Sequence, residues 1–121
     1  MLNSTEIRQI GIETVSLESK SLQKLITLID ENFSKAVEDI LKSKGRVVVT
    51  GIGKSAIIAQ KIVATFNSTG TPALYMHAAD AIHGDLGMMQ QDDVAICISK
   101  SGNSPEIKTL APLITRGGNI L

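Results

Sequence analysis

Apolar side chains recur every three or four positions over the first third of the chain, the spacing that lays one apolar stripe along a helix. The stripe comprises Leu22, Leu25, Ile26, Ile29, Phe33, Val37, Ile40 and Leu41. It predicts one long helix that ends at Gly45, a glycine expected to cap it in the left-handed conformation, with Lys42 and Lys44 in the last turn. Residues 3 to 16 are predicted to form another helical segment.

From Gly45 onward the pattern changes to short apolar runs, each followed by glycine or polar residues and then by a helical pattern. This texture is typical of βαβ units, and unbroken apolar runs predict parallel strands covered on both faces. The predicted strands are 46–50, 73–76 and 94–98, and a fourth is expected to begin at 119–121. A domain that stops as a strand begins is expected to be a fragment or to need partner subunits to cover its sheet.

Two crossover helices are predicted between these strands. The first runs from Ser55 to about Asn67, ends at Gly70, and is expected to bury Ile58, Ile62, Val63 and Phe66. The second begins with Ser104 as its N-cap and Pro105 at the first helical position. Pro112 lies inside it and is expected to kink it.

Composition narrows the class of protein. The chain has 121 residues with 12 Lys and Arg against 12 Asp and Glu, so it lacks the basic footprint of a nucleic-acid or membrane-surface binder. A single cysteine, Cys97, can form neither an internal disulfide nor a cysteine-based zinc site. No stretch approaches the roughly 20 apolar residues that cross a bilayer. We therefore expect one cytoplasmic globular domain over residues 1–121.

The loop after the first strand, Gly51-Ile52-Gly53-Lys54-Ser55-Ala56, matches two nucleotide motifs only in part. A dinucleotide fingerprint needs an acid at the end of the next strand, where Tyr75-Met76-His77 supplies none. A P-loop needs a glycine at position 48, which is a valine. What remains is an anion site built from Lys54 and a helix N-terminus, or a tight turn with a solvated lysine.

The loop after the third strand, residues 99–106, carries three serines, a glycine and an asparagine just before a helix start. One serine explains an N-cap, whereas three exceed that need. Hydroxyls and N-terminal amides are groups that grip a phosphate, so the loop is a candidate phosphate site, with an ordinary polar loop as the alternative. Glu106 in the first helical turn is a candidate general base, or a charge that stabilises the helix.

Two histidines follow the second strand. His83 precedes glycine and Asp85, a carboxylate close enough in sequence to orient it for proton transfer, although a surface-loop histidine fits equally. His77, at the strand end, has the same two interpretations with less support. Two histidines without a suitable carboxylate pattern do not make a metal site.

Taken together, GIGKS, NSTGTP, HGDLGMM and ISKSGNSPEI resemble the sugar isomerase (SIS) domain, and AIHGDLGM is similar to the arabinose 5-phosphate isomerases of the KpsF/GutQ type. The resemblance runs from about Gly11 to Leu121. It implies a three-layer α/β/α sandwich with a parallel, flavodoxin-like sheet of five strands, which is C-terminally incomplete if Leu121 is the true terminus. It also implies a cytoplasmic homotetramer.

The resemblance implies reversible interconversion of D-ribulose 5-phosphate and D-arabinose 5-phosphate through a cis-enediol, at the entry to Kdo and lipopolysaccharide synthesis, with no metal or organic cofactor. The catalytic positions it implies are Lys54, Glu106 and His83. The implied phosphate-binding residues are Ser99, Ser101, Gly102 and Ser104, and Gly53 and Ser55 are the implied substrate contacts.

The sequence departs from the family at Lys100, where relatives often carry Asn, and at Asn103, where they often carry Glu. The family also draws a further glutamate and histidine from segments downstream of Leu121, and the paired CBS domains that often follow are absent from this chain. A non-catalytic SIS module that senses a phosphosugar is therefore the alternative function. An interaction scaffold without a site is disfavoured by Lys54, Glu106 and the three loop serines.

Overall fold

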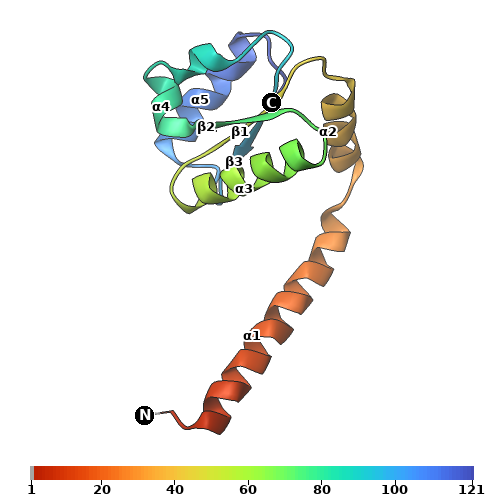
Figure 1. Cartoon of the computed structure of the whole chain (residues 1–121), viewed down its shortest axis with the longest axis vertical. Coiled ribbons are helices and arrows are strands. Elements are labelled where there is room, and N and C mark those ends of the chain that lie inside the picture. The colour runs from red at the N-terminus through yellow and green to blue at the C-terminus, as the bar shows by residue number, and fades with distance from the viewer. Residues whose placement is uncertain (1) are drawn as a thin grey trace. The chain divides into compact units, whose positions relative to one another are not determined.

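The computed structural model describes residues 2–121 (Figure 1). The chain divides into two compact units, one up to Val37 and the other spanning Glu38–Leu121. Within the described residues, no helix is both long enough and apolar enough to cross a membrane.

The single long helix expected over the apolar stripe is wrong. The chain forms α1 (Ser4–Leu25), a short 3₁₀ turn η1 (Ile26–Leu28) and a separate α2 (Glu31–Lys42). The break arises because the Asp30 carboxylate accepts hydrogen bonds from the backbone N–H groups of Asn32 and Phe33, at 2.9 and 3.2 Å, and so starts a new helix. These bonds, that from Phe33 foremost, hold the pKa of Asp30 below its usual value.

The N-terminus of α1 has a complete capping box. The Asn3 side chain accepts hydrogen bonds from the backbone N–H groups of Thr5 and Glu6, each at 3.0 Å, and the Glu6 carboxylate accepts the Asn3 N–H at 2.8 Å. The helical segment expected from residue 3 is therefore confirmed, although it runs on to Leu25.

Gly45 is not the left-handed cap that the sequence suggested, because its φ is not positive. A glycine is required at position 45 for a different reason. A Cβ at this position would collide with the backbone of Asp92 and Asp93, so only glycine permits this close approach of two chain segments.

The sheet contains three parallel strands in the order β2-β1-β3, namely β1 (Val47–Gly51), β2 (Ala73–His77) and β3 (Val94–Ile98). The predicted strands are confirmed to within one residue. Ile120 forms an isolated parallel bridge with Val94, and its carbonyl accepts the Ala95 N–H at 2.8 Å. The expected start of a fourth strand is thus present as a bridge.

Helices cover both faces of the sheet (Figure 1). On one face α3 (Lys54–Ser68) buries Ala59 against Val47 and Val49, with Phe66 packed beside them. The prediction that Ile58 is buried is wrong, because this side chain is 54% exposed. The helix instead directs its small residues, Ala56 and Ala59, toward the sheet, which lets it lie close to the strands.

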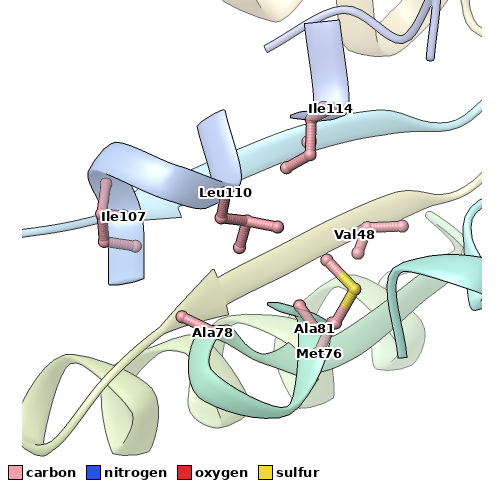
Figure 2. Close-up of a cluster of buried hydrophobic side chains, with 8 residues drawn as sticks. Val48, Met76, Ala78, Ala81, Ile107, Leu110 and Ile114 are labelled. Carbon is pink, nitrogen blue, oxygen red and sulfur yellow. The ribbon is translucent and has the colours of Figure 1, made fainter. Parts of the chain in front are cut away.

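The opposite face is covered by α4 (Ala78–Ile82) and α5 (Pro105–Arg116). Figure 2 shows Ile107, Leu110 and Ile114 of α5 directed toward Val48 and Met76 of the strands. Ser104 precedes α5 and Pro105 is its first residue, as predicted. The helix continues past Pro112 to Arg116, and the kink there stays a prediction.

A hydrogen-bonded ion pair fixes the amino edge of the sheet. Asp93, 1% exposed, accepts hydrogen bonds from the backbone N–H and the side chain of Arg46 and from the Gln90 N–H. Arg46 also donates to the Met88 carbonyl at 2.8 Å. Burial alone would raise the pKa of the Asp93 carboxyl, but these hydrogen bonds hold that pKa below its usual value.

Candidate functional site

The carboxyl edge of the sheet contains a topological switch point between β1 and β3. The chain leaves β1 for β2 on one side and later enters β3 on the other side. In such sheets ligands bind outside the strand ends at this point. Because Gly51 lies opposite Ile98 in the register, the loops that follow β1 and β3 lie side by side, and these are the two loops that the sequence singled out.

The turn after β1 depends on two glycines. Gly53 has a φ of 60°, which side-chain-bearing residues rarely adopt. At Gly51 a Cβ would lie 3.0 to 3.2 Å from the backbone of Ser55 and Ala56, so glycine lets the first turn of α3 lie directly on the strand end. The turn places Lys54 at the first position of α3 with its side chain exposed, and Ser55 half-buried behind it.

The loop after β3 is held by its own serines. The Ser99 hydroxyl accepts the Gly102 N–H at 3.0 Å, and the Ser101 hydroxyl accepts the Asn103 N–H at 3.1 Å. Gly102 has a φ of 66°. Each serine uses an oxygen lone pair in these bonds, so each O–H remains available to donate to a ligand oxygen.

Ser104 differs from the expected capping serine. It occupies the N-cap position of α5, but its hydroxyl makes no capping hydrogen bond and is buried without any partner. Glu106 is half-buried in the first turn of the same helix. The N–H groups of Glu106 and Ile107 have no acceptor within the helix, as at any helix start. The loop therefore offers hydroxyl and amide donors at one place.

His83 ends α4 and is exposed. Within residues 2–121, no hydrogen bond or ion pair joins it to Asp85, Lys54 or Glu106, so its predicted orientation by Asp85 is not seen. The predicted loop around it is instead α4 followed by the 3₁₀ turn η2 (Asp85–Met88).

Two residues at this edge are not among the predicted site residues: His77 had little support from the sequence, and Thr50 was not considered. His77 lies opposite Gly51, and its Nδ1 atom is buried without a hydrogen bond, 3.6 Å from an Asp80 carboxylate oxygen. Thr50 is fully buried and its hydroxyl has no partner. The sequence feature that could have identified them is their position at the ends of predicted strands. With Ser104, they place three unpartnered buried polar atoms at the carboxyl edge.

Within the described residues, no three His, Cys, Asp or Glu side chains lie close enough together to hold a metal ion. Burial raises the pKa of the Cys97 thiol to about 11, which keeps it protonated and unreactive near neutral pH.

Comparison with known proteins identifies the family of this chain. Residues 40–121 match the SIS domain. The chain belongs to the SIS domain family. It is 53% identical over 107 residues to arabinose 5-phosphate isomerase KdsD of Francisella tularensis, covering 86% of this chain and 33% of the relative. It is 50% identical to KdsD of Pseudomonas aeruginosa, covering 87% of this chain and 32% of that relative.

A solved structure of Escherichia coli CFT073 c3406 in complex with arabinose 5-phosphate superposes with a TM-score of 0.91 at 39% identity, over 98% of this chain and 63% of that one. The α/β fold with a parallel sheet is thus the fold of this family. This SIS domain chain spans about a third of the length of the curated relatives it matches.

Proposed function

We propose that the carboxyl edge of the sheet binds a phosphosugar and that the protein interconverts D-ribulose 5-phosphate and D-arabinose 5-phosphate through a cis-enediol. One observation carries this proposal. The loop with Lys54 and the serine-rich loop before α5 lie side by side at the β1/β3 switch point, each leading into a helix N-terminus. Similarity to arabinose 5-phosphate isomerases, and to a structure that holds arabinose 5-phosphate, supports the substrate class.

The phosphate binds the loop after β3. The hydroxyls of Ser99 and Ser101 already hold the loop through their oxygens and donate their O–H groups to phosphate oxygens. Gly102 gives the loop the positive φ that this turn needs. Ser104 supplies an unpartnered hydroxyl, which turns toward the phosphate, and the first free amides of α5 complete the donor set.

The reaction moves one proton between C1 and C2 of the sugar, so it needs a base and a donor for the developing oxyanion. In the proposed scheme Glu106 takes the proton from one carbon and returns it to the other. The Lys54 ammonium stabilises the negative oxygen of the enediolate, and His83 assists ring opening and proton transfer. Gly53 and Ser55 contact the sugar at the start of α3. In the proposed scheme no metal or organic cofactor takes part.

The same proposal includes the assembly, the cellular compartment and the pathway of the enzyme. Residues 1–121 act as one SIS domain in a cytoplasmic homotetramer, and the product feeds synthesis of Kdo and lipopolysaccharide. Because the chain spans a third of its curated relatives, segments beyond it in those proteins are expected to contribute to the complete site.

The test adds ribulose 5-phosphate to the purified protein and follows arabinose 5-phosphate. Lys54→Ala is expected to lower turnover about 10³-fold through loss of oxyanion stabilisation. Lys61→Ala is the matched control, because Lys61 is an exposed lysine on the same helix that hydrogen-bonds only to Thr65, and it is expected to keep full activity. Equal turnover by both variants would contradict the role of Lys54.

A phosphosugar sensor is the second candidate, since the serine loop alone can bind phosphate. Titration of the protein with arabinose 5-phosphate, followed by amide chemical shifts of residues 99–107, separates binding from turnover. Binding with no turnover in any longer form of the protein would favour the sensor. Absence of both would leave only the shared fold.

A further inference from the structure

His77 and Asp80 approach each other at the corner where β2 leads into α4. His77 ends β2 and occupies the N-cap position of α4, and Asp80 lies three residues further on, in the first turn. Side chains at these two positions lie near each other, as they do in a capping box. The His77 Nδ1 atom is 3.6 Å from an Asp80 carboxylate oxygen. The sequence suggested such a histidine and carboxylate at His83 and Asp85, where the described residues show no hydrogen bond or ion pair.

The two nitrogens of the His77 ring lie in different surroundings. Nδ1 is buried without a hydrogen-bond partner, whereas Nε2 is not buried and forms no hydrogen bond within residues 2–121. The side chain as a whole is 35% exposed. Tyr75 lies edge-on to the imidazole, with the ring centroids 6.5 Å apart, and this contact limits rotation of the ring. One nitrogen is therefore directed into the protein and the other is open to a ligand.

The contact with Asp80 decides which nitrogen holds the proton of the neutral ring. An ionised carboxylate only accepts hydrogen bonds, so Nδ1 can bond to it only as N–H. The 3.6 Å separation is longer than a hydrogen bond, and such bonds in ligand-free sites often shorten once substrate binds. Asp80 is exposed, so its side chain is free to rotate toward the ring. With the proton on Nδ1, Nε2 carries the lone pair and is an acceptor.

The place of His77 along the carboxyl edge indicates what Nε2 accepts. The strand order β2-β1-β3 puts His77 on one side of the Lys54 turn and the serine loop on the other. His77 lies opposite Gly51, which has no side chain to fill the space beside the imidazole. Neighbouring strands are about 4.8 Å apart, so the ends of β2 and β3 are about 10 Å apart, a span comparable with an extended pentose phosphate.

We propose that His77 is a substrate-binding residue, that Asp80 and Tyr75 hold its ring, and that Nε2 accepts a hydrogen bond from a hydroxyl at the C1 end of the sugar. The position of the ring proton follows from the contact with Asp80 alone. The sugar contact rests on the proposed function, in which the serine loop holds the phosphate. The contact favours phosphosugars over inorganic phosphate, because only the sugar brings a hydroxyl donor to this distance from the phosphate.

Long-range nitrogen–proton NMR spectra of the ligand-free protein, at about pH 8.5 where imidazole is neutral, report which nitrogen is protonated. The chain has two histidines, so His83→Gln identifies the His77 signals. We expect the proton of His77 on Nδ1, and Asp80→Ala is expected to move it toward Nε2, the form that free histidine prefers in water. Asp85→Ala is the matched control and is expected to leave the His77 signals unchanged. A proton on Nε2 in the wild type, or signals insensitive to Asp80→Ala, would overturn the pairing.

Calorimetric titration with arabinose 5-phosphate and with inorganic phosphate tests the sugar contact. His77→Phe keeps an aromatic ring beside Tyr75 but has no acceptor. It is expected to weaken arabinose 5-phosphate binding about tenfold and to leave phosphate binding unchanged. His77→Gln keeps an amide oxygen near the position of Nε2 and is expected to restore most of the affinity. Unchanged sugar phosphate binding by His77→Phe, or equal losses for both probes, would refute the contact.

The two measurements distinguish a wrong phosphosugar site from a wrong role of His77. If the wild type binds neither probe, the proposed site fails together with the sugar contact, while the NMR spectra still decide the pairing of His77 with Asp80. If the wild type binds both probes and turns over the substrate, but His77→Phe behaves like the wild type, the site stands and His77 has no part in it.

Discussion

Buried polar groups are hydrogen-bonded at the amino edge of the sheet, where the strands begin, and lack hydrogen bonds at the carboxyl edge, where the strands end. At the amino edge, Asp93 accepts four hydrogen bonds, three of them from Arg46. The Asn119 amide beside it donates to the carbonyls of Gln90 and Asp93, at 2.7 and 2.9 Å. At the carboxyl edge, buried polar atoms of Thr50, His77 and Ser104 have no hydrogen-bond partner.

This difference indicates that the two ends of the strands have different roles, one in stability and the other at the candidate site. A buried polar atom without a partner costs about 1 to 3 kcal/mol, and native proteins contain few of them. Thr50 in β1 and Ser104 in the loop after β3 flank the switch point where parallel sheets bind ligands, and His77 lies at the end of the neighbouring β2. The amino edge holds the strands in place, whereas the carboxyl edge keeps unfilled hydrogen-bonding capacity beside Lys54 and the serine loop.

The largest expected effect on stability comes from removing the ion pair between Asp93 and Arg46 at the amino edge. Asp93→Asn removes the charge that faces Arg46 and places amide N–H groups against hydrogen-bond donors, so we expect a loss of about 3 kcal/mol in the free energy of unfolding. Urea denaturation measures it. Asp92→Asn, at an exposed neighbouring position, is the control and is expected to stay within about 0.5 kcal/mol of the wild type.

The same carboxylate predicts a pH dependence. Because the pKa of Asp93 is lower in the folded state than in the unfolded chain, its contribution is fully present above about pH 4 and is lost as the pH falls through the folded value. The stability difference between wild type and Asp93→Asn is therefore expected to be constant from pH 7 to 5 and to shrink below pH 4. A difference that instead grew on acidification would show that the ion pair does not stabilise the fold.

The sequence predicted the parts of the molecule that follow from local rules. The strand 94–98 is an unbroken apolar run between polar turns, and its bounds are confirmed. That the loops bearing Lys54 and Ser99 meet follows from a general property of parallel sheets. The break at Asp30 was missed because the apolar spacing continues across it, although an aspartate before a helical segment is a start signal in its own right.

Other features depend on tertiary packing and could not be predicted from local sequence patterns. Gly45 is required by the approach of Asp92, a residue 47 positions away in the chain. The unpartnered state of Thr50 and the absent cap at Ser104 exist only once helices cover the strand ends. Local patterns therefore located the loops of the candidate site, and the structure added which buried polar atoms near them lack a hydrogen-bond partner.

At the carboxyl edge we expect the opposite effect on the free energy of unfolding. Thr50→Val replaces an unpartnered buried hydroxyl with a methyl group of the same shape, so we expect the free energy of unfolding to stay constant or to rise by up to about 1 kcal/mol. Urea denaturation without ligand measures it, and Thr50→Ser, which keeps the hydroxyl and loses the methyl, is the control. Destabilisation by Thr50→Val would mean that the hydroxyl has a partner and that the two edges are alike.

The smallest expected change separates a serine that caps a helix from one that binds a ligand. Ser104→Ala is expected to leave the free energy of unfolding within about 0.5 kcal/mol of the wild type, because its hydroxyl makes no capping hydrogen bond. Asn3→Ala, which removes a complete capping box, is expected to cost about 1 kcal/mol and serves as the comparison. Titration with arabinose 5-phosphate then supplies the second half of the test, since in the proposed site the Ser104 hydroxyl acts only when phosphate is bound. Ser104→Ala should weaken binding severalfold while Asn3→Ala leaves it unchanged, and a Ser104→Ala protein that is less stable but binds normally would assign this serine to the helix instead of the ligand.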